Sequence, residues 1–144
     1  MSEHVPIPGG RDVRGVLDRA TPVDGVPSSA VVACPPDPRH RGNRSDGRLR
    51  AVSDALTARG VDCLRFDYGP FDEGYGESTD VDRAVGWALE RYDRVAIFGF
   101  SFGGCLALVA GASRPECVGV SALAPTARLN PDVDAVAALD SLTT

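Results

Sequence analysis

A serine between two glycines, in the run Gly99-Phe100-Ser101-Phe102-Gly103, is the clearest candidate for chemistry in this sequence. The spacing G-x-S-x-G is typical of a sharp turn from a strand into a helix, where the serine oxygen stands exposed as a nucleophile. Glycines two residues before and two residues after the serine let neighbouring segments pass closely. The helix that follows directs its positive end at negative charge developing there. The spacing therefore predicts a nucleophile at Ser101.

The residues around this serine favour such a turn over its main alternative. Residues 95–98 form a short apolar run typical of a buried strand, and residues 105–110 are apolar nearly all round, as in a buried helix. The alternative is a dinucleotide-binding turn, since residues 99–104 match G-x-G-x-x-G except for a serine in the middle. That turn requires an acidic residue at the end of the next strand, where this chain has Ala-Leu-Ala-Pro at 122–125.

Strand and helix patterns alternate along the rest of the chain, which predicts a mostly parallel sheet between helices. Two weak strand candidates come first, followed by four short apolar strands, and the last of these runs from Val118 to Leu123. We expect helices capped by Ser45, started by Ser78 or Thr79, and, in the tail, capped by Asn130. The expected strands are 5–8, 13–17, 29–34, 61–66, 95–98 and 118–123, and the expected inner helix positions are Leu49, Val52, Ala55, Leu56, Ala58, Val81, Ala84, Val85 and Ala88.

Composition excludes several classes of protein. The net charge of −5 disfavours nucleic acid as a partner, and all 15 basic residues are arginine. No apolar run is long enough to span a membrane and the first residues do not form a signal sequence, so we expect a cytoplasmic protein without membrane contact. The four cysteines lack the close spacing of zinc or redox sites, so we expect buried thiols, no metal and no cofactor.

Three segments resemble α/β-hydrolases of the dienelactone-hydrolase-like or prolyl-oligopeptidase-like kind. They are CPPDPRHRG from Cys34, CLRFDYGPFDEGYGE from Cys63, and IFGFSFGG followed by VSALAP, and they stand in the family's order between Val31 and Pro125. The resemblance implies one domain over residues 1–144, folded as a three-layer α/β/α sandwich with a mostly parallel sheet. It also implies that the two opening strands are antiparallel and that Ser101 attacks a small ester or thioester.

In this resemblance the oxyanion would be held by backbone N–H groups. Phe102, directly after the serine, supplies one, and Asp37 is the candidate for the second because Pro35, Pro36 and Pro38 have no N–H. The family usually has histidine or glycine where this chain has Asp37. Its carboxylate has the wrong sign beside an oxyanion unless Arg39 or Arg41 neutralises it.

The chain departs from the family after the serine. The family's triad acid and base follow the nucleophile on two further strands, in the order Ser, Asp, His, whereas the only histidines here are His4 and His40. We therefore expect a C-terminally truncated fold with impaired hydrolysis. His40 is an alternative base or a solvated surface residue, and Asp67 is expected to bond loop amides between Tyr68 and Gly76. The other interpretations are an inactive binding or structural domain, or a shortened gene product.

The departure also leaves an edge on the expected sheet. The strand from Val118 to Leu123 is apolar like a central strand, but no later segment of the chain is expected to pair with it. An open edge of this kind invites pairing with another strand. We therefore expect a homodimer through this edge, coverage by the tail helix within 126–144, or poor solubility.

Overall fold

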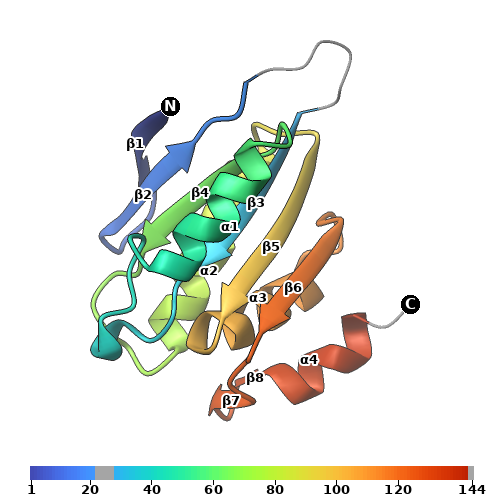
Figure 1. The fold of residues 1–144 in the computed structure, drawn as a ribbon. Helices are drawn as coiled ribbons and strands as arrows, with labels where there is room; N and C mark the ends of the chain where they lie inside the picture. The colour runs from blue at the N-terminus through green and yellow to red at the C-terminus, as the bar shows by residue number, and fades with distance from the viewer. Residues whose placement is uncertain (22–27, 143–144) are drawn as a thin grey trace.

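A six-stranded sheet forms the centre of the computed structural model, which describes residues 1–21 and 28–142 (Figure 1). The strand order is β1-β2-β4-β3-β5-β6, with β1 and β2 antiparallel and the last four strands parallel to one another. The fold class and the antiparallel opening strands are therefore as predicted. The strands are β1 (Ser2–Ile7), β2 (Val13–Asp18), β3 (Ser29–Cys34), β4 (Asp62–Asp67), β5 (Arg94–Phe100) and β6 (Gly119–Leu123), and a separate short hairpin comprises β7 (Arg128–Asn130) and β8 (Val133–Asp134).

The helices form a layer on each face of this sheet. Helix α1 (Gly47–Thr57) lies on one face, and α2 (Tyr75–Leu89) and α3 (Phe102–Ser113) lie on the other (Figure 1). The last helix, α4 (Ala135–Leu142), packs against α3, and a short 3-10 turn, η1 (Pro38–His40), precedes α1. These layers form the expected α/β/α sandwich. Within the described ranges, no helix has the length and apolarity needed to cross a bilayer.

The two faces of the sheet are covered unequally. The larger core lies under α2 and α3 and includes the fully buried Phe66 and Leu106. The smaller core lies under α1 and centres on Leu49, Cys63 and Phe98. Because α1 is the only described helix on its face, the side of the sheet towards β6 has little cover there.

Helix α1 differs from the prediction at its start and on its inner face. The carboxylate of Asp46, not Ser45, caps it, accepting hydrogen bonds from the N–H groups of Arg48 (2.9 Å) and Leu49 (3.3 Å). Ala55 and Ala58 are exposed, and Ser53 is buried instead. A serine can occupy that face because its hydroxyl donates to Asp18 on β2.

Helix α2 begins several residues before the predicted Ser78 or Thr79. Its first residue is Tyr75, and Gly74 precedes it in the left-handed region with φ of 92°. The buried carboxylate of Glu77 accepts a hydrogen bond from the N–H of Gly74 (3.1 Å) and closes the first turn. The expected inner residues, namely Val81, Ala84, Val85 and Ala88, are all buried.

Strand β6 and the tail also correct the prediction. Strand β6 is not buried, because alternate residues along it are exposed. Leu123 at its end is 53% exposed, and Val118 just before it is 64% exposed. Asn130 does not cap a helix, because its side-chain oxygen accepts from the N–H groups of Asp132 and Val133 (both 2.8 Å) within the β7–β8 turn. Asp134 caps α4 instead, accepting from the N–H of Val136. The tail helix lies on α3 and does not cover β6.

The four cysteines are free thiols, and the three expected in apolar surroundings are buried. Burial raises the pKa of Cys34 and brings that of Cys63 to about 12. These thiols pack as small apolar side chains.

Candidate active site

Ser101 lies between the end of β5 and the start of α3, in the sharp turn that the motif predicts. Its backbone has φ of 56° and ψ of −113°, a combination that is strained for a residue with a side chain. The N–H of Ser101 donates to the carbonyl of Leu123 on β6 (3.0 Å), and its own carbonyl accepts from Gly104, Cys105 and Thr126 (2.9–3.1 Å). Backbone bonds on both sides thus hold the strained conformation, while the hydroxyl has no partner in the part of the chain that the structure describes.

The two glycines of the motif are required by packing. A Cβ atom on Gly99 would lie 2.0 Å from the carbonyl oxygen of Gly103. A Cβ atom on Gly103 would lie 2.3 Å from the carbonyl oxygen of Cys34 and 2.4 Å from that of Pro35. Such contacts are well inside van der Waals distance. The start of α3 therefore touches the backbone that leaves β3, the segment expected to hold the second oxyanion donor.

The backbone N–H groups of both predicted oxyanion donors have no hydrogen-bond acceptor among the described residues. The N–H of Phe102 is the first of α3, and neither it nor the N–H of Asp37 meets an acceptor among the residues at 1–21 and 28–142. The positive end of α3 lies at the same point. An unpaired donor beside the serine, such as the N–H of Phe102, is what stabilisation of a tetrahedral oxyanion would need.

Tyr68 links the two donor segments, a role that the sequence did not reveal. Its buried hydroxyl donates to the carbonyl of Pro35 (2.7 Å), and its ring meets that of Phe102 edge-on at 5.6 Å between centroids. Burial raises the pKa of Tyr68 well above its usual value, so it stays a donor. The only sequence signal was an aromatic residue directly after a strand that ends on this edge of the sheet.

The carboxylate of Asp37 is neutralised by Arg39, one of the two arginines considered for this part in the sequence. Arg39 forms an ion pair with it at 2.8 Å, and the Arg39 guanidinium also lies 4.2 Å from the centre of the Phe71 ring. Burial alone would raise the pKa of Asp37, but side-chain and backbone hydrogen bonds from Arg39 outweigh it, and the pKa is lowered. Asp37 is thus an anion that is already paired.

No described residue places a base against Ser101. His40 is exposed at the end of η1 and forms no hydrogen bond with Ser101. His4 is on β1, the strand at the opposite edge of the sheet. Asp67 does not bond the amides after Tyr68; it accepts from the N–H of Arg44 (2.8 Å) and forms an ion pair with its guanidinium.

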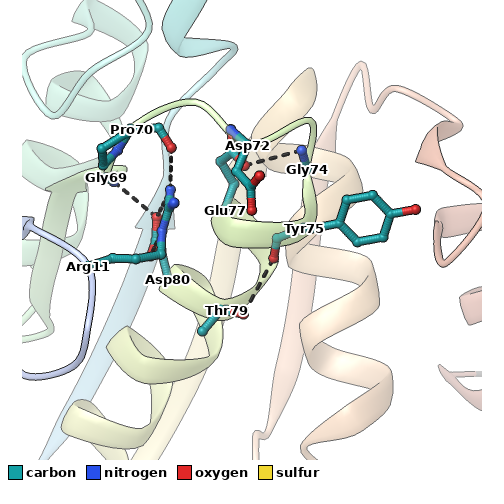
Figure 2. A network of polar contacts seen from close by, with 9 residues as sticks. All are labelled: Arg11, Gly69, Pro70, Asp72, Gly74, Tyr75, Glu77, Thr79 and Asp80. Atoms are coloured by element: carbon teal, nitrogen blue, oxygen red, sulfur yellow. Dashed lines mark hydrogen bonds and ion pairs between the residues drawn. The ribbon is translucent and has the colours of Figure 1, made fainter.

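The loop at residues 68–74 forms one wall of the candidate site, and buried carboxylates from α2 fix it (Figure 2). Asp80 accepts hydrogen bonds from the N–H of Gly69 (3.0 Å) and from the guanidinium of Arg11 (2.8 and 3.1 Å). Glu77 accepts from the N–H groups of Asp72 and Gly74, and Figure 2 shows the ring of Tyr75 pointing away from this network. Glu77 and Asp80 therefore accept hydrogen bonds from the amides of this loop, which is the role predicted for Asp67.

A pocket of about 420 Å³ lies between this loop, the start of α3 and the β7–β8 hairpin. It is lined by Arg39, Phe71, Glu73, Tyr75, Phe102, Leu129, Asn130 and Pro131. A larger hollow of about 610 Å³ lies at the other end of the strands, next to Ser29, Asp62 and Trp87. Parallel sheets bind ligands at the carboxyl ends of their strands, and the smaller pocket lies at that end, where Phe102, the residue after Ser101, contributes to its lining.

Comparison with solved structures identifies the fold. The chain is similar to XC6422 from Xanthomonas campestris, an α/β serine hydrolase without a lid (25% identity, TM-score 0.73, covering 83% of this chain and 60% of that one). It is similar to a dienelactone hydrolase from Anabaena variabilis (23% identity, TM-score 0.79, covering 100% and 70%) and to Est1E from Butyrivibrio proteoclasticus (21% identity, TM-score 0.72, covering 86% and 51%). No family model and no curated protein matches the sequence.

These similarities show that the chain has the α/β-hydrolase fold, with dienelactone-hydrolase-like proteins among its structural neighbours. The chain spans 60–61% of the length of several of these proteins. The predicted fold is thus confirmed, while the roles of individual residues stay predictions.

Proposed function

We propose that this chain is a serine hydrolase-like protein in which Ser101 is the nucleophile towards small ester or thioester substrates. One observation carries the proposal: Ser101 has the strained backbone of a strand-to-helix turn, with the unpaired N–H of Phe102 beside it. Backbone strain persists only where surrounding structure enforces it, and it is concentrated at functional sites. The hydrolases among the structural neighbours support the same reaction class.

The proposed reaction has two steps. The Ser101 oxygen bonds to the carbonyl carbon of the substrate, its proton passes to a base, and the N–H groups of Phe102 and Asp37 hold the resulting oxyanion. Collapse breaks the bond to the leaving alcohol or thiol, which takes a proton, and water then releases the acid from Ser101. The pocket is lined by Phe71, Tyr75 and Phe102 and also by the polar Arg39, Glu73 and Asn130, so it offers both apolar and polar contacts to a small acyl group.

The proposal includes impaired hydrolysis by these 144 residues. No described side chain takes the proton from Ser101, and losing one member of a triad costs on the order of 10⁴-fold in rate. The oxyanion donors alone can sustain a slow residual reaction. The proposed compartment is the cytoplasm, in keeping with four cysteines that stay unpaired.

Labelling with a fluorophosphonate probe tests the proposal, since the serine oxygen bonds to phosphorus and fluoride leaves. We expect slow labelling that Ser101→Ala abolishes and that Ser45→Ala, at an exposed serine before α1, leaves unchanged. His40→Gln should leave the rate unchanged. Rapid labelling that His40→Gln abolishes would contradict the impairment and identify His40 as the base.

A catalytically inactive binding or structural domain is the second candidate. The exposed position of His40 and the unpartnered Ser101 hydroxyl favour it. Complete absence of labelling in protein whose circular dichroism shows the folded state would support this candidate and overturn the proposed nucleophile.

A further inference from the structure

Among the residues that the structure describes, no strand pairs with the outer edge of β6. Within the described part of the chain, β6 pairs with β5 on one side only, and α4 packs on α3 without covering the other side. Natural proteins blunt such edges with charges, prolines or bulges. Between Glu116 and Arg128 this chain has no charged residue, and its one proline, Pro125, follows the strand.

The backbone of β6 presents hydrogen-bonding groups at this edge. The carbonyl of Leu123, the last residue of β6, accepts from the N–H of Ser101, directly after β5 (3.0 Å), which fixes the side towards which Leu123 points. Backbone groups of successive strand residues point alternately to the two sides. Gly119 and Ser121 therefore point towards β5, as Leu123 does, and Val120 and Ala122 direct their N–H and C=O groups outward, towards an additional strand.

The side chains of β6 are complementary to a second, antiparallel copy of the same strand. With the two Ser121 residues facing each other, Gly119 of one copy faces Leu123 of the other, so that the smallest side chain meets the largest. On the opposite face Val120 meets Ala122. Cross-strand pairs of this kind are the units that stabilise a sheet. No charge is buried, because the exposed positions in this strand are uncharged.

We propose that β6 pairs with β6 of a second copy of this chain, around a two-fold axis at Ser121. The pairing joins the two sheets into one and covers part of the apolar surface exposed at Leu123 and Val118. A two-fold interface uses the same patch on both subunits, as this register requires. A single short strand pair buries less area than most permanent interfaces, so the dimer is reversible.

Opposite charges at the axis give a sharp test. Ser121 is exposed, so Ser121→Lys and Ser121→Glu leave the fold of one subunit intact. Each variant alone places like charges against each other and should dimerise at least about tenfold more weakly than the unaltered chain. An equimolar mixture should recover dimers, because Lys then faces Glu. Of the variant samples, only the mixture should show an average mass rising from 15.1 kDa towards twice that value in sedimentation equilibrium, as the unaltered chain should.

Ser45→Lys and Ser45→Glu provide the matched control, since Ser45 is also exposed but lies in the loop before α1. Their mixture should sediment like the unaltered chain. The proposal is overturned if the unaltered chain stays at 15.1 kDa up to about 1 mM. It is also overturned if the Ser121 variants dimerise alone, or if their mixture stays monomeric while the unaltered chain dimerises. These outcomes do not depend on whether Ser101 reacts.

Discussion

At Gly103 the backbone of α3 approaches the carbonyl groups that follow β3 more closely than any side chain would permit. The same contact brings the N–H of Phe102 near the loop that carries Asp37. The close approach of these segments is therefore a condition for both proposed oxyanion donors to serve one site.

Gly103→Ala should destabilise the protein by about 1–3 kcal/mol or more, because its methyl group would have to displace the backbone at Cys34 and Pro35. Urea unfolding measures the change. The control is Gly47→Ala at the exposed start of α1, where an added Cβ meets no atom within 4 Å. Equal midpoints for the two variants would contradict the close contact.

Residues within one local pattern could be predicted from the sequence. The turn at Ser101 was predictable because strand, glycine spacing and helix stand next to one another in the chain. The part played by Tyr68 was not, because it depends on Pro35 and Phe102, which are far from it in sequence. Its hydroxyl bond and ring contact exist only once β3, β4 and α3 lie side by side.

Among the elements, α2 does more than cover the sheet, because its first two turns hold the loop beside the candidate pocket. Asp80 is fully buried and paired with Arg11, which also donates to the carbonyl of Pro70 (2.6 Å). This pair joins the turn after β1, the loop after β4 and the helix itself (Figure 2). The position of Phe71 at the pocket depends on that anchor.

Asp80→Ala should cost about 2–3 kcal/mol of stability, since it leaves the Arg11 guanidinium and the N–H of Gly69 without their acceptor. Asp82→Ala on the same helix is the matched control. Asp82 forms a partly exposed ion pair with Arg114 at 2.8 Å, worth under about 1 kcal/mol. Thermal unfolding of both variants measures the difference, and equal losses would count against the anchor.

The boundaries of the helices were less predictable than their inner faces. The stripe from Val81 to Ala88 follows from spacing alone and is buried as expected. The start of α2 depends on Glu77 reaching back to Gly74, and the start of α1 depends on a choice between adjacent Ser45 and Asp46. The capping propensities of adjacent residues alone do not determine which of them begins the helix.

Across the whole molecule, Asp18 connects four elements. It accepts hydrogen bonds from Arg65 on β4 (2.6 and 3.1 Å), from Ser2 on β1 and from Ser53 on α1, while it belongs to β2. Partial burial works to raise the pKa of Asp18, but these hydrogen bonds outweigh it and lower the pKa from 3.8 to about 2. The folded state therefore favours the charged carboxylate.

Asp18→Asn should accordingly destabilise the protein by about 1–2 kcal/mol at pH 7, after allowance for solvent screening. The lowered pKa means that this contribution is complete above about pH 4 and disappears as the pH falls through about 2. Urea unfolding at pH 7, 4 and 2.5 would show the two proteins converging at low pH. Asp12→Asn, at an exposed pair with Arg14, serves as the control and should change little.

The unequal cover of the sheet was only partly predictable. The alternating pattern predicted the layers, but the apolar run from Val118 to Leu123 suggested a buried strand, and β6 is half exposed. An apolar strand is expected to have its side chains buried on both faces of a sheet. Its hydrophobicity does not predict which segment of the chain buries them.

The packing at Gly99 and Gly103 also bears on how this sequence can change in evolution. Both glycines are held by backbone contacts that exist whether or not Ser101 reacts. A lineage that lost catalysis would keep both glycines, so their presence does not indicate whether the protein is active. Position 101 is different, because its φ of 56° and ψ of −113° would be met more easily by glycine once a nucleophile was no longer selected. If serine is retained at position 101 in diverging descendants, its retention would therefore indicate that the reaction is under selection.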